Sequence, residues 1–295
     1  MTTRAAGDVW KHTVELVRQL GALGCETTIA VVSGELGEDA RLDAARLTNV
    51  DLRVSPYASD LRRGRNAHAA REWLERLAEE SGPDLLHAND CSSATARVPV
   101  PILLVVHECG AAAPATARSR SRGPSHQVVV AALERAERIV APTSACLAAT
   151  LMRYPEADVD GRDCVIHPGI DAGRRLGVKE PIGDGCRSEV FASTASHEPF
   201  GYDVLEAALG GRALVLGDVP SRRELWDGAA IFVDPNDERA LARVLERLRA
   251  DPSEARLRGE AARSRAFRYS ARTMALAYVE AYAAMLDEHL VAVSW

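Results

Sequence analysis

Hydrophobic residues in the first half of the chain alternate between the spacing of helices and that of strands. Between residues 9 and 24 they recur with a period near 3.6, at Val9, Trp10, Val14, Val17 and Leu20. That period predicts an amphipathic helix, which Asp8 caps and Gly24 ends. The next segment, Glu26–Ser33, is rich in β-branched residues and predicts a strand that stops before Gly34.

The same two patterns recur as far as residue 166. They predict helices over residues 66–80 and 125–137 and a third that begins at Thr143 or Ser144. They predict strands at Val50–Val54, Pro83–His87, Pro101–Val106, Arg138–Ala141 and Cys164–Ile166. Because strands and helices alternate, we expect a parallel sheet that is covered by helices on both faces.

A Gly-rich stretch from Pro168 to Gly185 precedes a second alternating segment. This segment predicts strands at Glu189–Ala192, Ala213–Leu216 and Ala229–Val233, and helices over residues 201–209, 220–226, 236–249, 253–267 and 270–288. A chain of 295 residues is longer than one compact domain usually needs. We therefore expect an N-terminal domain at residues 1–167 and a C-terminal domain at residues 168–295, with residues 168–186 as the linker.

The composition is that of an ordinary globular protein, with 47% hydrophobic residues, 26% charged residues and a formal net charge of −6. These proportions exclude a disordered, collagen-like or low-complexity chain. The slight acidity gives no attraction for nucleic acid, so we expect no nucleic-acid partner. No apolar run approaches the roughly 20 residues of a transmembrane segment, and Met1–Ala6 has no signal-peptide character. We therefore expect a cytoplasmic protein.

The six cysteines are spread along the chain without a Cys-x-x-Cys pair. This spacing argues against a zinc site and against a disulfide framework. We expect reduced thiols, no metal site and no cofactor. Polar residues instead follow the predicted strands, as in His87–Asp90, His107-Glu108 and Ser196–Glu198. Parallel α/β sheets bind their ligands at these carboxyl ends of the strands.

The segment from Ser196 to Glu206 carries the most specific chemical signal. Glu198 leaves a predicted strand, and Pro199-Phe200-Gly201 leads into a helix that holds Glu206. A helix start of this kind presents backbone N–H groups and a positive dipole end to a phosphate. The two glutamates would then accept hydrogen bonds from hydroxyls on either side of a diphosphate, which suits a nucleotide sugar. From spacing alone, a capped helix with an exposed Glu198 and a salt-bridged Glu206 explains the pattern equally well.

Glu198–Gly201 followed by Val204–Ala207 resembles the Glu-x7-Glu motif of retaining family-4 glycosyltransferases. The resemblance continues through Gly211–Ala230, and it includes the weaker segments Gly7–Trp10, Pro83–Asn89, Val140–Ser144 and Val165–Asp171. It implies an α/β fold of the GT-B type, in which two Rossmann-like parallel-sheet domains face a cleft. It also implies transfer of a sugar from a nucleotide-diphosphate sugar to an acceptor with retention of anomeric configuration.

The resemblance assigns roles to individual residues. Glu198 and His107 would act at the transferred sugar, and Glu206 would bind the ribose hydroxyls. The backbone of Phe200-Gly201-Tyr202 would face the diphosphate. Gly7 would lie beside the donor phosphates. In this family the leaving phosphate itself is thought to deprotonate the acceptor, so the protein holds the partners together and stabilises negative charge.

Two features depart from the family pattern. The chain starts nearly at the first turn, without a preceding strand, and Asp8 stands where a second glycine is expected. A block is also absent between Asp171 and Glu189. In the family this block supplies three strands and an Arg/Lys pair that binds the phosphates. Arg174, Arg175 or Lys179 would replace these cations, or the stretch is a polar linker.

The shortened second sheet would need a cover, from a homodimer partner or from the C-terminal helix with Tyr278, Tyr282 and Met285. The sequence thus leaves two hypotheses. One is an active glycosyltransferase with a glycan or small-molecule acceptor. The other is a catalytically impaired remnant or a non-catalytic partner subunit of such an enzyme.

Overall fold

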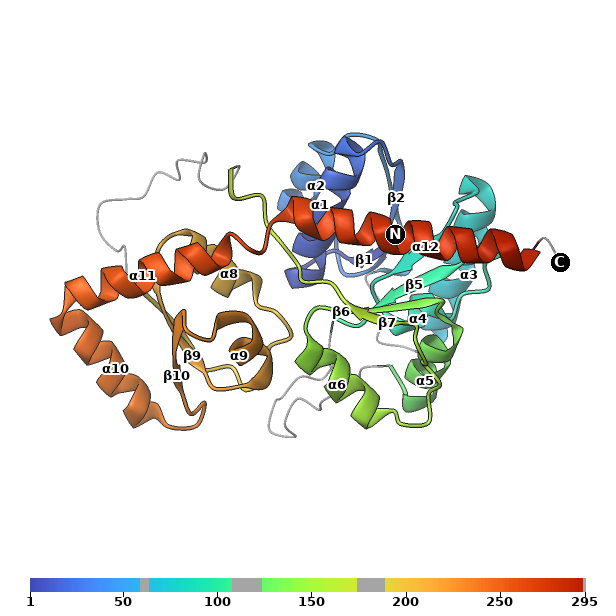
Figure 1. The fold of residues 1–295 in the computed structure, drawn as a ribbon. Coiled ribbons are helices and arrows are strands. Elements are labelled where there is room, and N and C mark those ends of the chain that lie inside the picture. The colour runs from blue at the N-terminus through green and yellow to red at the C-terminus, as the bar shows by residue number, and fades with distance from the viewer. Residues whose placement is uncertain (59–63, 108–123, 174–188, 294–295) are drawn as a thin grey trace. The chain divides into compact units, whose positions relative to one another are not determined.

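A computed structural model describes residues 1–58, 64–107, 124–173 and 189–293 (Figure 1). The chain forms two compact units. Unit 1 comprises Met1–Pro142, Cys146–Ile166 and Met274–Trp295, and unit 2 comprises Thr143–Ala145 and His167–Thr273. The chain therefore passes from unit 1 into unit 2 after residue 166 and returns to unit 1 at residue 274. The predicted cations Arg174, Arg175 and Lys179 lie outside the described residues.

Unit 1 is built on parallel strands in two sets. The first set has the order β1-β2-β3, with β1 at Thr2–Arg4, β2 at Thr27–Ser33 and β3 at Val50–Val54. The second has the order β4-β5-β6-β7, with β4 at Leu86–Ala88, β5 at Ile102–Val105, β6 at Arg138–Ala141 and β7 at Asp163–Val165. Asn89, directly after β4, joins the two sets because its backbone N–H and its side-chain amide both donate to Thr2 of β1.

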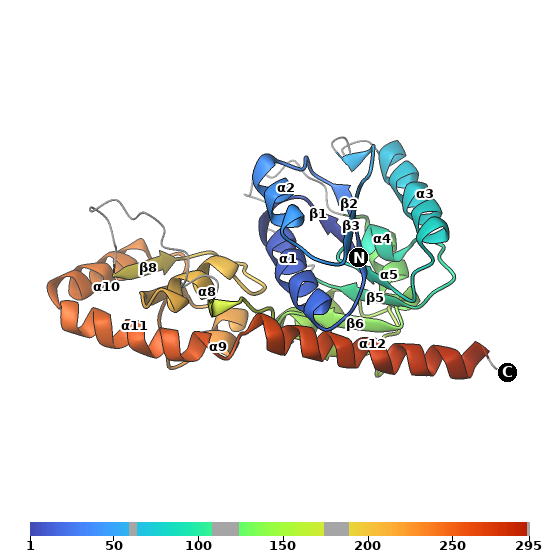
Figure 2. The ribbon, with the colours of Figure 1, turned by 90° about the horizontal axis from the view of Figure 1, so that it is seen from above.

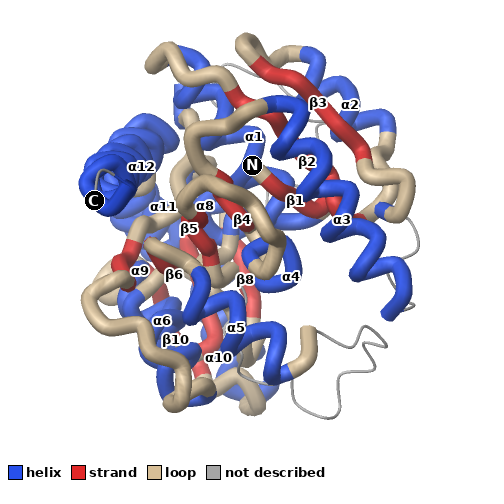
Figure 3. The backbone as a smooth tube through the Cα atoms, turned by 90° about the vertical axis from the view of Figure 1, so that its right-hand side faces the viewer, coloured by secondary structure: helices blue, strands red, loops and turns tan. Residues whose placement is uncertain are grey.

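Helices enclose these strands, which Figure 3 shows in red. They are α1 (Gly7–Ala22), α2 (Glu38–Ala45), α3 (Gly64–Ser81), α4 (Cys91–Ala94), α5 (His126–Arg135), α6 (Ser144–Arg153) and α12 (Ala271–Val293). Side chains of β5 alternate between two apolar clusters. Leu104 packs with Leu133 of α5, whereas Leu103 packs with Leu16 of α1 and Tyr278 of α12. Helices α1 and α12 therefore share one face of the sheet (Figure 2).

Unit 2 has a parallel sheet of the order β10-β9-β8, with β8 at Val190–Ser193, β9 at Ala213–Gly217 and β10 at Ala230–Val233. Its helices are α8 (Tyr202–Leu209), α9 (Pro220–Trp226), α10 (Glu238–Ala250) and α11 (Pro252–Ala266). Leu214 and Leu216 pack under α8 and α11, and Val215 faces Leu248 of α10 on the other side. Both faces of the central strand are thus buried, as its unbroken apolar sequence predicts.

The two ends of unit 2 run side by side. Ile170 pairs with Ser270 in an isolated parallel bridge, in which the Ile170 N–H donates to the Tyr269 carbonyl at 3.1 Å. The Ala271 N–H in turn donates to the Ile170 carbonyl at 3.2 Å. Gly169 makes this approach possible, because a Cβ atom there would lie 2.3 Å from the Ser270 carbonyl oxygen.

The structure corrects the expectation that no strand precedes the first turn. Thr2–Arg4 forms β1, which pairs with β2 and is followed by Gly7 at the start of α1. Thr2 and Thr3 are buried although they are polar, since Thr3 bonds to Thr13 and Thr2 accepts from Asn89. This is why a hydrophobic pattern does not reveal the strand. The helices α2 and α4 were also not predicted. Among the described residues, no helix is long and apolar enough to cross a membrane.

Candidate functional site

The turn that leads from β8 into α8 has the conformation that its glycine predicts. Gly201 has φ +84° and is the N-cap of α8, with no side-chain cap on the helix. A Cβ atom at this position would lie 3.1 Å from Val204 Cγ2 and 3.2 Å from Glu198 Cγ. The stem of Glu198 therefore lies directly against the turn. Glycine is needed here both for its backbone conformation and for space.

The predicted residues beside Gly201 are side chains of the core. Phe200 is 5% exposed and Tyr202 is 2% exposed, and their ring centroids are 5.5 Å apart. Phe200 also packs edge-on against Tyr269, at 5.7 Å. Any contact of these two residues with a ligand would therefore involve their backbone, the part of them that was expected to face the diphosphate.

Glu198 and Glu206 are both half-buried and belong to the same strand–turn–helix segment. The backbone of Glu198 is held by α9, because the hydroxyl of Ser221 donates to its carbonyl oxygen. Glu206 lies further along α8, beyond Asp203, whose carboxylate accepts from the Val204 N–H at 2.8 Å. Three acidic residues thus belong to this turn and the helix that follows it.

A buried cation, which the sequence patterns did not reveal, lies behind this turn. Arg222 of α9 is 0% exposed. It donates from Nη1 to the carbonyl oxygens of Ser193 at 2.6 Å and Ala195 at 3.3 Å, and from Nη2 to Ser193 Oγ at 2.7 Å. Burial lowers the pKa of Arg222, while the carboxylates of Glu198 and Asp203 raise it. Arg222 is one of three consecutive charged residues in α9, with Arg223 and Glu224, and most charged side chains face solvent, so the sequence does not single it out.

In unit 1, His107 follows β5 and is half-buried. Its Nε2 lies 2.6 Å from Asn89 Oδ1, and its ring packs edge-on against His12 of α1 with a centroid distance of 4.8 Å. The pKa of His107 is lowered well below its usual value, chiefly by burial and further by His12, His87 and Arg4. His107 is therefore a neutral ring at neutral pH.

A cluster of rings continues from His107 through His12 and His87 to Tyr282, and none of these three was expected to act at the sugar. His87 is a buried residue of β4; its Nδ1 lies 2.6 Å from the Tyr282 hydroxyl oxygen, and its Nε2 lies 3.3 Å from Asn89 Oδ1. Burial lowers the pKa of His12 to about 4 and raises the pKa of Tyr282. Tyr282 comes from α12, nearly two hundred residues from His87 in sequence, and local patterns do not reveal such contacts.

Gly7, the residue expected beside the donor phosphates, is exposed and opens α1 with φ +71°. No side chain caps this helix, and Asp8 lies in its first turn. A Cβ atom at Gly7 would meet no atom within 4 Å. The glycine is thus required by its backbone conformation rather than by crowding.

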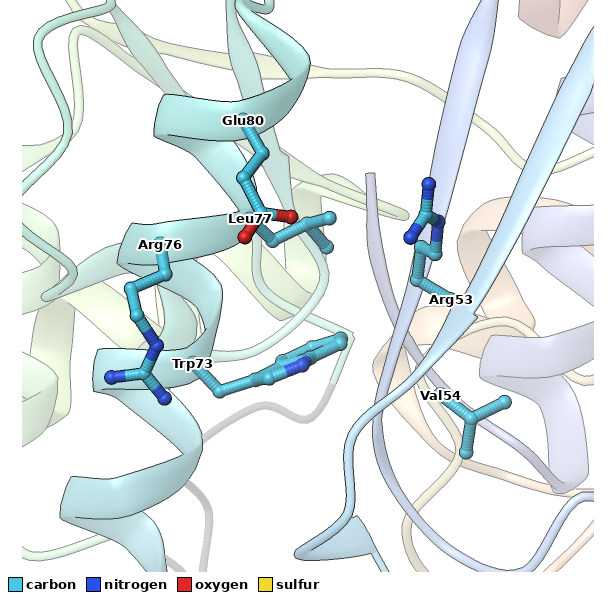
Figure 4. Close-up of a pocket in the computed structure, with 6 residues that line it drawn as sticks. All are labelled: Arg53, Val54, Trp73, Arg76, Leu77 and Glu80. Carbon is cyan, nitrogen blue, oxygen red and sulfur yellow. The ribbon is translucent and has the colours of Figure 1, made fainter.

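A hollow of about 200 Å³ lies elsewhere in unit 1, between β3 and α3 (Figure 4). It is lined by Arg53, Val54, Trp73, Arg76, Leu77 and Glu80. None of the predicted site residues borders it. Within the described part of the chain, no group of three or more His, Cys, Asp or Glu side chains could hold a metal ion.

Solved structures share this fold. Sucrose-phosphate synthase from Thermosynechococcus elongatus aligns with a TM-score of 0.78 at 16% identity, over 97% of this chain and 95% of its own. HepE from Anabaena, in complex with UDP-glucose, aligns with a TM-score of 0.71 at 15% identity, over 96% and 98%. A glycosyltransferase from Rickettsia africae aligns with a TM-score of 0.68 at 13% identity, over 97% of each chain.

These similarities confirm the predicted α/β fold of the GT-B type, with Rossmann-like parallel sheets. No curated protein sequence matches the chain significantly. The sequence profile described as Glycosyltransferase Family 4, however, matches residues 9–174, which is more than half of the 295 residues. The parallel sheets and the polar residues at the strand ends agree with this match. Because the profile covers more than half of the chain, the chain belongs to Glycosyltransferase Family 4.

Proposed function

We propose that this protein transfers a sugar from a nucleoside-diphosphate sugar to a hydroxyl of an acceptor, with retention of anomeric configuration. The family supports a transferase, and HepE, which shares the fold, has been crystallised with UDP-glucose. The observation that carries the proposal is the strand–turn–helix segment in which the stem of Glu198 lies against Gly201, the uncapped start of α8, and Glu206 follows on the same helix.

Each part of this segment suits one part of such a donor. The start of α8 carries the positive end of the helix dipole and no side-chain cap, which favours a diphosphate. Glu206 would accept hydrogen bonds from the ribose hydroxyls, and Glu198 would accept them from the sugar. Arg222 offsets part of the negative charge of Glu198, so that this carboxylate can stay ionised beside the donor.

Retention is the part of the proposal that rests on the resemblance to retaining enzymes. In this mechanism the leaving phosphate takes the proton of the acceptor hydroxyl on the same face of the sugar. The C1–O bond to the phosphate breaks as the bond to the acceptor oxygen forms. The protein contributes by holding the reactants together and by stabilising the charge on the phosphate.

Donor binding can be measured by thermal shift with a panel of UDP-, GDP- and ADP-sugars. A donor present at about 100 times its dissociation constant stabilises the folded protein by about 2.7 kcal/mol. We expect a shift with at least one donor, and a loss of that shift in Glu206→Gln. The matched control is Glu260→Gln, an exposed residue of α11. The absence of any shift with every donor at millimolar concentration would contradict the proposal.

Transfer itself is tested with the donor that binds, by following release of the nucleoside diphosphate and the anomeric configuration of the product by NMR. We expect product with the anomeric configuration of the donor, and its loss in Glu198→Gln. Inverted product would contradict the retaining mechanism. Binding without any transfer would instead support the alternative of a non-catalytic subunit.

A further inference from the structure

Asn89 connects two histidines of neighbouring strands, His87 within β4 and His107 just after β5. Its side-chain oxygen lies 2.6 Å from Nε2 of His107 and 3.3 Å from Nε2 of His87. Its side-chain nitrogen donates to the carbonyl oxygen of Thr2 at 2.8 Å. Thr2, His87 and Asn89 are all buried, so water does not compete for these bonds.

The positions of the protons follow from what each atom can do. The carbonyl oxygen of Thr2 only accepts, so the amide nitrogen of Asn89 faces Thr2 and its oxygen faces the histidines. An amide oxygen also only accepts, so both facing Nε2 atoms carry hydrogen. Nδ1 of His87 is then an acceptor, and the hydroxyl of Tyr282 donates to it at 2.6 Å.

The surroundings keep His107 from taking a second proton. Besides burial, the groups that oppose its positive charge are His12 of α1, His87 of β4 and Arg4 of β1. A neutral imidazole with hydrogen on Nε2 has its lone pair on Nδ1. In the part of the chain that the structure describes, the hydrogen bond of His107 uses Nε2. Nδ1 of this half-buried residue therefore keeps the lone pair that can accept a hydrogen bond from a ligand.

We propose that Asn89 is a positioning residue, which holds His107 in the form protonated at Nε2 so that Nδ1 accepts a hydrogen bond from a hydroxyl of the transferred sugar. The inference rests on the proposed function, and it defines what His107 does there. A ring protonated on Nδ1 or on both nitrogens would present an N–H to the sugar instead of a lone pair. His107 is thus neither a general acid nor a cation for phosphate.

The first test needs no substrate. The full chain is labelled with ¹⁵N-histidine, and the ring nitrogens are observed by long-range ¹H–¹⁵N NMR at neutral pH. The signals of His107 are those missing from the spectrum of His107→Gln. We expect a neutral ring with its hydrogen on Nε2. A hydrogen on Nδ1, or a charged ring, would overturn the proposal.

Two variants then separate Asn89 from the rest of the cluster. Asn89→Ala removes the acceptor, so His107 is expected to populate both neutral forms. Tyr282→Phe is the control, because it removes the donor to His87 but leaves the bond between Asn89 and His107 in place. An unchanged His107 spectrum in folded Asn89→Ala would overturn the proposal. If that variant does not fold, the wild-type spectrum still decides.

The last measurement links the ring to the reaction. With a donor that is turned over, we expect kcat/KM to fall about tenfold in Asn89→Ala, the effect of one lost hydrogen bond, whereas Gln127→Ala on α5 retains wild-type values. An unchanged kcat/KM in Asn89→Ala would overturn the role of Nδ1. If the wild type turns over no donor, the proposed function and the role of Nδ1 both fail, while the spectra still show whether Asn89 sets the protonation of His107.

Discussion

The guanidinium of Arg222 holds Ser193 through two hydrogen bonds, to its carbonyl oxygen at 2.6 Å and to its hydroxyl at 2.7 Å. Ser193 is the last residue of β8, and the chain continues from it through Ala195 to Glu198. A side chain of α9 thus fixes the strand end from which the Glu198 turn departs. The carboxylate of Glu198 in turn favours the charged form of this buried side chain and raises the pKa of Arg222, against the effect of burial.

Replacing Arg222 is expected to weaken unit 2. Arg222→Met leaves the carbonyl of Ser193 without its donor and removes the charge that faces Glu198. We expect the free energy of unfolding to fall by about 2–4 kcal/mol, as for other buried charges that lose a partner. Denaturant unfolding monitors this change, with Arg256→Met on the exposed side of α11 as control. A loss no greater than that of the control would show that the bonds to Ser193 contribute nothing.

Gly201 is expected to be essential for donor binding as well as for stability. Gly201→Ala places a side chain at φ +84°, which costs about 1–2 kcal/mol, and crowds Glu198. Gly211→Ala is the matched control, because Gly211 has φ +74° but nothing within 4 Å of a Cβ atom. Gly211→Ala should lose the stability that the strained backbone alone costs, and Gly201→Ala should lose at least as much. The thermal shift by the donor should disappear only in Gly201→Ala, and equal shifts in the two variants would contradict a binding site at this turn.

Gly259 is expected to be the least replaceable residue of α11. A Cβ atom there would lie 2.1 Å from the carbonyl oxygen of Gly211, so the helix must move away from the sheet. Gly259→Ala should therefore lose about 3 kcal/mol or more of unfolding free energy, at the upper end of overpacking. Gly37→Ala, with open space around its Cβ position but at the N-cap of α2, should lose no more than about 1 kcal/mol. A melting temperature of Gly259→Ala close to wild type would show that α11 does not pack this tightly.

The buried histidines predict that acid destabilises the protein. Burial lowers the pKa of His12 to about 4 in the folded state, against about 6.5 in an unfolded chain, and the pKa of His87 is lowered as well. As pH falls from 6.5 towards 4, the unfolded chain binds protons that the folded chain does not. The free energy of unfolding then falls by at most about 1.4 kcal/mol per pH unit for each of these histidines.

Urea unfolding between pH 7 and pH 4.5 measures this slope. His12→Gln should flatten it, because glutamine does not titrate, whereas His68→Gln on the exposed surface of α3 should not. Carboxylates also contribute to the loss of stability at low pH, since hydrogen bonds lower the pKa of the exposed Glu156 and Asp218. For this reason the assignment to His12 is tested by the difference in slope between the two histidine variants, and not by the total loss of stability. Equal slopes in both variants would contradict the assignment to His12.

The alternation of hydrophobic residues was sufficient to predict most of the fold. It predicted the strand Arg138–Ala141 and the helix Pro220–Trp226 with the boundaries that the structure has. In both segments the hydrophobic spacing and the signals for the ends of the element agree. It missed β1, whose threonines are buried by hydrogen bonding rather than by hydrophobicity. The roles of Glu198, Glu206, Gly7 and His107 came from strand-end position and resemblance, and they stay predictions.

The supporting residues could not be predicted, because their partners are distant in the chain. Asn89 bonds to Thr2, and Tyr282 bonds to His87 across 195 positions. Arg222 lies on α9 and bonds to Ser193 at the end of β8, with α8 and β9 between them in the chain. Nothing in the local sequence around these residues indicates the contact, since each depends on how the sheets are assembled.

The bridge between Ile170 and Ser270 makes most of unit 2 an insertion whose two ends meet. A segment with this property can be exchanged for another of the same kind, since the host needs to supply only two neighbouring attachment points. Evolution could thus change the half of the protein that carries the Glu198 turn while leaving the strands and the histidine cluster of the other half intact. In such a chain, new donor specificity would arise by replacement of a cassette rather than by gradual revision of the whole molecule.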